Sequence, residues 1–429
     1  MQNIDMQMDR RRLFQMAGLG ALAASLPMPL MAFVGRQYPT LNAKLKSYLD
    51  GRKAAGIVMA VGHGDEKPDV IKGGKLSFAS QTPVDENSLF RIYSMTKPIT
   101  GIAAMVLVEE GKIKLDQPIA DFLPKFANMQ VLTDPAKSMD AKPAKTQITL
   151  RHLLTHTAGL GYTIINKGPI RDAYVKAGVV PGQVSLMTIP GLSREESVRG
   201  LANFADNLAP LPLIAEPGTK WSYSVSLDLT AHLIAVVSGM DYDAFLQSRI
   251  FDPLGMDSTF FRVPKSDTHR LTTNYGVDKG KLQAIDPGKA SVYSAEPAFA
   301  FGGAGLVCSA HDYDRFLHCL MNHGKLGDVR IMSDAIAKLA MSNLLPAGIN
   351  TDGTFAHGAG FGAGGRVGLG AQAGSFGWGG AAGTNGFVST KWRVRATGMV
   401  QYMPSAAQDF QNKFPSWVIA DLAAQGKLG

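Results

Sequence analysis

Cysteine is scarce in this chain, which has only Cys308 and Cys319 among its 429 residues. Residues 309–321 have the pattern of one helix, and a helix rising about 1.5 Å per residue would hold the two cysteines about 16 Å apart. Because the α-carbons of a disulfide lie within about 7 Å of each other, we expect two free thiols. Without a disulfide, the stability of the fold depends on its hydrophobic core. A chain of 429 residues is long enough for one large domain or two interleaved ones.

Long apolar runs and runs of like charge are also missing. Apart from the start of the chain, no segment reaches the roughly eighteen consecutive apolar residues of a membrane helix. The net charge is +8 at pH 7, but it is spread along the chain and accompanies no nucleic-acid-binding motif. With 45% apolar and 18% charged residues, the composition is that of a globular protein. We therefore expect no nucleic-acid partner and, once a leader is removed, no stable membrane span.

The start of the chain has the pattern of a bacterial export signal. Arg10, Arg11 and Arg12 precede an apolar stretch, Met16 to Leu26, that is rich in Ala, Leu and Gly. A basic region followed by a short apolar segment is typical of a signal peptide, and paired arginines indicate the twin-arginine type. We expect residues 1–35 to be this signal, and the rest of the chain, 36–429, to be periplasmic or secreted. A disordered basic tail is the alternative.

The stretch around which the rest is organised is Ser94-Met95-Thr96-Lys97. Residues 101–110 are mostly apolar and predict a helix that Gly111 can close in the left-handed conformation. Ser94 would lie at the N-terminus of this helix, where free backbone N–H groups favour negative charge developing on a substrate oxygen. Lys97 follows one turn later and can act as the base that a serine nucleophile needs. A helix cap followed by a solvated lysine is the alternative.

Tyr223 lies in the turn before a second apolar helix, residues 227–237. A tyrosine in this position can donate a hydrogen bond to a group above the helix or take a proton from it, although many such rings only anchor a core. His152 and His156 are four residues apart in a predicted helix, 148–160. Because no third ligand accompanies them, we interpret both as structural and expect no metal site.

The remaining patterns indicate an α+β protein. Strands are predicted over residues 56–62, 75–79, 375–378, 386–389 and 395–401, and further helices over 41–50, 197–204, 242–250, 309–321 and 409–425. Strands at both ends of the chain imply one antiparallel sheet flanked by helices, with an inserted, mostly helical domain between. The α/β part would span about 36–115 and 285–429, and the helical part about 116–284. Ser375 nearly matches a nucleophile elbow, but no apolar helix follows it, so we interpret it as a decoy.

With Ser94, Lys97 and Tyr223 in place, the chain resembles the penicillin-recognising serine hydrolases, which include class C β-lactamases, D,D-peptidases and family VIII carboxylesterases. The resemblance runs in order from Gly56 to Gln401, and several separated matches carry more weight than one motif. Further matches are residues 148–160, Pro217-Gly218, 251–256, 302–309 and Trp378-Gly379-Gly380. It implies a three-layer αβα, β-lactamase-like fold.

Two departures decide between the branches of this family. The β-lactamases carry asparagine two places after the tyrosine, where this chain has Val225. Their late Lys-Thr-Gly strand is replaced here by Trp378-Gly379-Gly380. That lysine helps to bind a substrate carboxylate, and such charge-assisted contacts are worth about 1.5 to 3 kcal/mol. Because tryptophan cannot make one, the resemblance is closest to the family VIII esterases, and a small uncharged carboxylic ester is the expected substrate.

The resemblance also implies the site residues. Ser94 would form the acyl-enzyme, with Lys97 and Tyr223 sharing the role of base. The backbone N–H groups of Ser94 and Ala381 would form the oxyanion hole. Trp378, Gly379 and Gly380, with Tyr162 and Phe299, would bind the substrate, and no cofactor is implied. The alternatives are a β-lactamase or D,D-peptidase, an acyltransferase that uses the same acyl-enzyme, and a non-catalytic receptor of the same fold.

Overall fold

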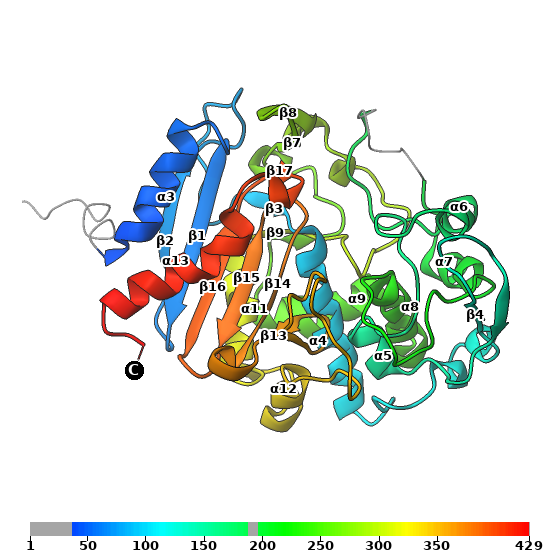
Figure 1. Cartoon of the computed structure of the whole chain (residues 1–429). Helices are drawn as coiled ribbons and strands as arrows, with labels where there is room; N and C mark the ends of the chain where they lie inside the picture. The colour runs from blue at the N-terminus through cyan, green and yellow to red at the C-terminus, as the bar shows by residue number, and fades with distance from the viewer. Residues whose placement is uncertain (1–36, 188–195, 429) are drawn as a thin grey trace, which may run out of the picture.

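The computed structural model describes residues 37–187 and 196–428, so the expected export signal lies outside the described residues. Its centre is a seven-stranded antiparallel sheet built from both ends of the described chain, in the order β12-β13-β14-β15-β16-β1-β2 (Figure 1). The strands are β12 Gly360–Phe361, β13 Arg366–Val367, β14 Ser375–Gly379, β15 Asn385–Ser389, β16 Val394–Met399, β1 Gly56–His63 and β2 Asp69–Gly74. The predicted α+β fold with an antiparallel sheet is confirmed.

Helices cover both faces of this sheet because its central strands are apolar on both sides. Along β1, Ile57 and Met59 pack into one core and Val58 into another, as the alternation of side chains along a strand requires. Helices α3 (Pro39–Asp50) and α13 (Phe410–Ala424) lie on the first face, and α11 (Ala310–Met321) and α4 (Thr96–Glu109) on the second (Figure 1). The sheet is thus the middle of three layers.

Helix α4 is the buried axis of the second layer. Every residue from Thr96 to Leu107 is buried, and Gly111, with φ +68°, takes the left-handed conformation predicted for it. Helix α8 (Ser226–Ser238) packs beside α4 and ends at Gly239 with φ +72°. A small sheet precedes α4, in which β9 (Val307–Ser309) pairs with β3 (Leu89–Arg91) and with β6 (Thr259–Phe260). These elements position the segment that carries Ser94.

The chain between α4 and β9 contains several short helices joined by long irregular segments, and the predicted helical part, with its limits at about residues 115 and 285, stays a prediction. Its helices are α5 Leu150–Leu154, α6 Pro169–Lys176, α7 Leu201–Leu208, α8, α9 Tyr242–Leu246 and α10 Asp252–Leu254, with a π-helical turn over Gln247–Phe251. Small hairpins are β4 Gln130–Leu132 with β5 Ala141–Pro143, and β7 Asn274–Asp278 with β8 Lys281–Asp286, which β17 Tyr402–Met403 joins in parallel. After β9 come α11, β10 Lys325–Leu326, β11 Val329–Arg330 and α12 Asp334–Ala340.

Three predicted elements are misplaced. The strand expected at 75–79 is β2, residues 69–74, and it ends where Gly74 turns sharply with φ +84°. The helix expected over 148–160 stops at Leu154, because His156 takes φ +56° before Gly159 is reached. The helix expected over 197–204 is α7, which begins after Gly200.

Cys308 and Cys319 are free and buried, which confirms the prediction of two thiols. In the two described ranges, no helix combines the length and the apolarity needed to cross a membrane.

Candidate active site

Ser94 projects from a tight turn between β3 and α4. Residues Tyr93–Met95 form one 3₁₀ turn, in which the N–H of Met95 donates to the carbonyl of Ile92 at 3.0 Å. Tyr93 itself has φ +42°, a left-handed conformation that is strained by about 1–3 kcal/mol in a residue with a bulky side chain. Its hydroxyl accepts a hydrogen bond from Asn274 at 3.0 Å, which helps to hold the turn. The strain therefore sits next to the residue that the sequence predicts as the nucleophile.

Lys97 lies in the first turn of α4, and its side chain is fully buried. Its Nζ donates to Ser94 Oγ at 3.3 Å and to the carbonyl of Gly303 at 2.7 Å. The same nitrogen lies 4.5 Å from the ring centre of Tyr223 and 5.7 Å from that of Tyr162. No carboxylate of the described residues forms an ion pair with it. The amine therefore meets the carbonyl of Gly303 and the rings of Tyr162 and Tyr223, all of which are far from it in the sequence.

Tyr223 is fixed by aromatic neighbours and by one hydrogen bond. The indole Nε1–H of Trp378 donates to its hydroxyl at 3.0 Å. Trp221 stacks on its ring at 6.0 Å and 14°, and His156 lies 4.7 Å from it. Because the hydroxyl oxygen accepts from Trp378, its own proton remains available for a bound substrate or for Ser94.

The end of β14 lies against the Ser94 turn. A Cβ on Gly380 would fall 2.4 Å from the carbonyl oxygen of Ile92, so only glycine allows this approach. The next residue, Ala381, is partly buried, and its N–H donates no hydrogen bond to any group in the described part of the chain. Gln411 Nε2 donates to the carbonyls of Gly380 (2.5 Å) and Thr384 (3.0 Å), which holds the segment. This arrangement fits the predicted oxyanion hole of Ser94 and Ala381.

The residues predicted to bind substrate are unequally placed. Tyr162 packs edge-on against Tyr223 at 5.4 Å, and Trp378 lies 5.7 Å from the same ring, so both adjoin the site. Gly379 follows Trp378 on β14, with the side chain of Gln411 where a Cβ would lie. Phe299 instead packs on Phe204 and Phe301, at 5.1 and 4.0 Å, within the apolar core.

The two histidines have structural partners. His152 Nδ1 accepts from the N–H of Thr149 at 3.2 Å, in a capping box that starts α5. His156 Nδ1 lies 3.0 Å from Ser224 Oγ, and burial, together with the charge of Lys97, lowers the pKa of its ring well below the ordinary value. Across the described ranges, no three His, Cys, Asp or Glu residues are grouped to hold a metal ion.

The sequence analysis missed two residues at the site. Asp228 is a buried carboxylate in α8, five positions after Tyr223, and the only signal was a lone acid in an apolar helix. Phe355 lies 5.6 Å from the ring of Tyr223 and is itself 56% exposed. Phe355 lies in an irregular loop, and the sequence of this loop contains no pattern that predicts a contact with the site.

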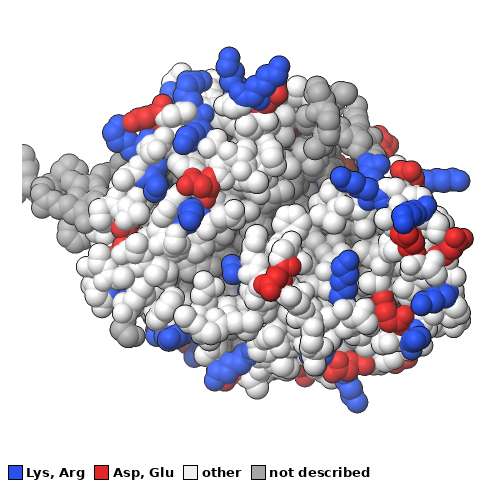
Figure 2. Space-filling view, in the orientation of Figure 1, with Lys and Arg blue, Asp and Glu red and all other residues white. Residues whose placement is uncertain are grey.

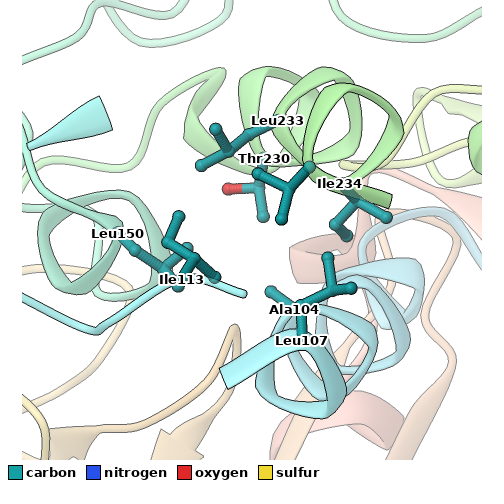
Figure 3. Close-up of a pocket in the computed structure, with 8 residues that line it drawn as sticks. Ala104, Leu107, Ile113, Leu150, Thr230, Leu233 and Ile234 are labelled. Atoms are coloured by element: carbon teal, nitrogen blue, oxygen red, sulfur yellow. The ribbon is translucent and has the colours of Figure 1, made fainter. Parts of the chain in front are cut away.

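A small apolar pocket lies apart from these groups, between α4, α5 and α8 (Figure 3). It is lined by Ala104, Leu107, Ile113, Leu150, Thr230, Leu233, Ile234 and Val237. Ala104 is seven residues beyond Lys97, about 10 Å along the helix axis. The hydroxyl of Thr230, the only polar side chain in the lining, donates to the carbonyl of Ser226 at 2.8 Å. The pocket offers no group for chemistry and reflects imperfect packing between helices.

Comparison with known proteins identifies the family. The β-lactamase family model matches residues 41–414. Esterase EstB of Burkholderia gladioli is 29% identical over 295 residues, 65% of this chain and 69% of that protein. A Penicillium citrinum enzyme, ML-236A carboxylate methylbutanoyltransferase mlcH, is 32% identical over 250 residues, 57% of this chain and 54% of that one.

The fold agrees with a solved structure, EstCE1, described as a hydrolase with promiscuous acyltransferase activity. The two structures superpose with a TM-score of 0.73 at 23% identity, covering 91% of this chain and 99% of that one. The match over residues 41–414 and the shared fold confirm the resemblance found in the sequence. This chain belongs to the β-lactamase family and is a serine hydrolase.

Proposed function

We propose that the protein hydrolyses small, uncharged carboxylic esters through an acyl-enzyme on Ser94. The observation that carries the proposal is the position of the buried Lys97 amine, 3.3 Å from Ser94 Oγ and 4.5 Å from the centre of the Tyr223 ring. A serine hydroxyl needs a base within hydrogen-bonding reach, and this amine is in reach.

In the proposed mechanism, Ser94 Oγ attacks the ester carbonyl carbon while its proton passes to the base formed by Lys97 and Tyr223. The carbonyl π bond opens, and the oxygen that becomes negative is held by the N–H groups of Ser94 and Ala381. The ester C–O bond then breaks, and the alcohol leaves with the proton. Water attacks the acyl-enzyme in the same way and releases the acid.

The substrate class follows from what faces Ser94. The family resemblance puts Trp378 at the position of the lysine that binds a substrate carboxylate in β-lactamases, and the N–H of Trp378 donates to the hydroxyl of Tyr223. On the face shown in Figure 2, Lys, Arg, Asp and Glu lie mostly toward the edge, and the central part carries few of them. Trp378 adds an apolar indole beside Tyr223, and an indole cannot pair with a substrate carboxylate, which supports an ester over a penicillin. The name of the relative EstB supports the same reading.

Acyl transfer is the second candidate, because the acyl-enzyme is common to hydrolysis and transfer. The relative from Penicillium citrinum is named as a methylbutanoyltransferase, and EstCE1 is described as having promiscuous acyltransferase activity. Adding an alcohol acceptor to the ester assay separates the two: a transferase yields the new ester in preference to the acid.

The test compares Ser94→Ala with Ser375→Ala, since Ser375 is the decoy on β14 and its hydroxyl donates to the carbonyl of Gln372. Ser94→Ala should abolish hydrolysis of p-nitrophenyl butyrate and leave the circular dichroism spectrum unchanged, whereas Ser375→Ala should keep wild-type turnover. Intact-mass spectrometry should detect an acyl adduct on the wild type and on Ser375→Ala, and none on Ser94→Ala. Retained turnover in Ser94→Ala would refute the assignment. Faster turnover of nitrocefin than of the butyrate ester would favour a β-lactamase.

A further inference from the structure

Asp228 lies in the first turn of α8, where it is the only carboxylate of the helix, and it is only 1% exposed. Its Oδ1 accepts a hydrogen bond from the N–H of Gly303 at 2.9 Å. Its Oδ2 is buried as well, and no group of the described residues donates to it. A buried carboxylate that is only half satisfied is costly, so its presence needs a reason beyond packing.

Gly303 connects this carboxylate to the active-site amine. Its N–H donates to Asp228, and its carbonyl accepts from Lys97 Nζ at 2.7 Å. A Cβ at this position would lie 2.7 Å from Asp228 Oδ2, so the close approach depends on glycine. The preceding carbonyl, of Gly302, accepts from Thr100 Oγ1 at 2.6 Å. One short backbone segment is therefore held from α8 on one side and from α4 on the other.

Among the titratable groups of the described residues that interact with Asp228, only Lys97 can carry a positive charge. Burial raises the pKa of Asp228 to about 6, and the charge of Lys97 opposes that rise. The other titratable groups that interact with the carboxylate are the phenols of Tyr162 and of Tyr242 on α9. Burial raises the pKa of both phenols well above the ordinary value, so they stay neutral. Lys97 is thus the group whose positive charge, once the amine is protonated, this carboxylate opposes.

We propose that Asp228 is a positioning residue and the counter-charge of Lys97. Its carboxylate fixes Gly303 so that the carbonyl receives the amine, and its negative charge stabilises the ammonium that forms when Lys97 takes the Ser94 proton. In that step the Ser94 O–H bond breaks and an N–H bond forms on Lys97, while Oγ bonds to the acyl carbon. This inference rests on the proposed ester hydrolysis, with Lys97 as the acceptor of that proton.

The direction of the stability effect separates this role from a merely structural one. Because the folded-state pKa lies above the ordinary value of 3.8, the favourable contribution of Asp228 is present below about pH 4 and is lost as the pH rises through about 6. Above pH 6 the ionised carboxylate therefore lowers the stability of the fold. A structural carboxylate would raise it.

The experiment compares Asp228→Asn with Asp421→Asn in the otherwise unchanged protein. Asp421 is a matched control, because it is a buried carboxylate that accepts the N–H groups of Thr40 and Leu41, both at 2.9 Å, in the layer of α3 and α13. At pH 8, Asp228→Asn should lower kcat for p-nitrophenyl butyrate by at least about tenfold with KM changed less than about twofold, on the usual scale of a charge-assisted contact. In the wild type, kcat/KM should rise with pH through about 6 as Asp228 ionises. This rise should be absent in Asp228→Asn.

The Tm supplies a readout that needs no turnover. At pH 8, Tm of Asp228→Asn should equal or exceed that of the wild type, whereas Asp421→Asn should lower Tm and keep wild-type kcat. Replacing Lys97 with Met should move the inflection of Tm against pH to higher pH, because the opposing charge is gone. An unchanged kcat, or a loss that is equal at every pH and accompanied by a lower Tm, would overturn the inference. If the wild type hydrolysed no ester, the proposed function would fail, and the Tm curves would still test the pairing of Asp228 with Lys97.

Discussion

Two buried basic side chains, Arg91 and Lys97, lie three residues before and three residues after Ser94, and their surroundings are opposite. Both side chains are fully buried. Arg91 has an acceptor for every N–H donor. These acceptors are Asp286 Oδ2 at 2.6 Å, the carbonyls of Thr272 at 2.5 Å and Asp286 at 3.1 Å, Ser291 Oγ at 2.9 Å and Gln401 Oε1 at 3.4 Å. Lys97 has one short hydrogen bond, to Gly303, and one long one, to Ser94.

The difference indicates that Arg91 keeps its proton, whereas Lys97 has to gain and lose one during catalysis. A buried guanidinium with a carboxylate and four further acceptors gains nothing by losing its proton, so it holds β3, β8 and the segment after β16 together. Among the described residues, Lys97 has no carboxylate in direct contact, and Asp228 acts on it through Gly303, so this amine can gain or lose a proton at a lower cost than a cation in a direct ion pair. The under-satisfied cation is therefore the one expected to take part in chemistry.

The largest expected effect is that of Lys97→Met on catalysis. Methionine fills the same space without a proton acceptor, so kcat/KM for p-nitrophenyl butyrate should fall by at least about 10³-fold. Below about pH 5, where Asp228 is protonated, the free energy of unfolding should change by only about 1 kcal/mol, since no ionised carboxylate then loses its counter-charge. Ester kinetics and urea unfolding measure the two quantities. A variant that failed to fold would place Lys97 with Arg91 among the structural cations.

Arg91→Met should show the reverse pattern. Removing one partner of a buried ion pair leaves Asp286 uncompensated, which costs about 3–5 kcal/mol of stability. The double variant Arg91→Met with Asp286→Leu should recover part of that loss, because both charges are then gone. Urea unfolding measures the stability, and titration with a fluorophosphonate counts the active sites that remain folded, so that ester turnover can be given per active site. Equal stability of wild type and Arg91→Met would contradict the structural role.

Much of the fold was predictable because it follows from local patterns. Apolar periodicity identified α13 and β14 to β16, and Gly111 marked the end of α4, as its left-handed backbone confirms. The cluster of Ser94, Lys97 and Tyr223 was also anticipated, since the first two are one turn apart and the third precedes a recognisable helix. Their catalytic roles, and the export signal expected in residues 1–35, stay predictions.

What the sequence could not reveal depends on contacts between distant segments. The helix after Thr149 ends early because His156 turns left-handed, where its ring packs against Tyr223, and no local rule assigns that conformation to histidine. Asp228 stood in an apolar helix without a visible partner, since the partner is the backbone N–H of a glycine 75 residues away. Phe355 reaches Tyr223 only through the folding of an irregular loop.

The smallest effect is expected for Trp378→Phe, which acts on the aromatic ring beside Lys97. Phenylalanine keeps an apolar wall but removes the N–H that donates to the hydroxyl of Tyr223 at 3.0 Å. A neutral hydrogen bond contributes about 0.5–1.5 kcal/mol, so kcat should fall about two- to tenfold as the phenol loses its fixed orientation. Tyr223→Phe removes the same hydrogen bond together with the phenol, so the double variant should be no slower than Tyr223→Phe alone. Additive losses in stopped-flow acylation rates would mean that Trp378 contacts the substrate directly instead of orienting the phenol.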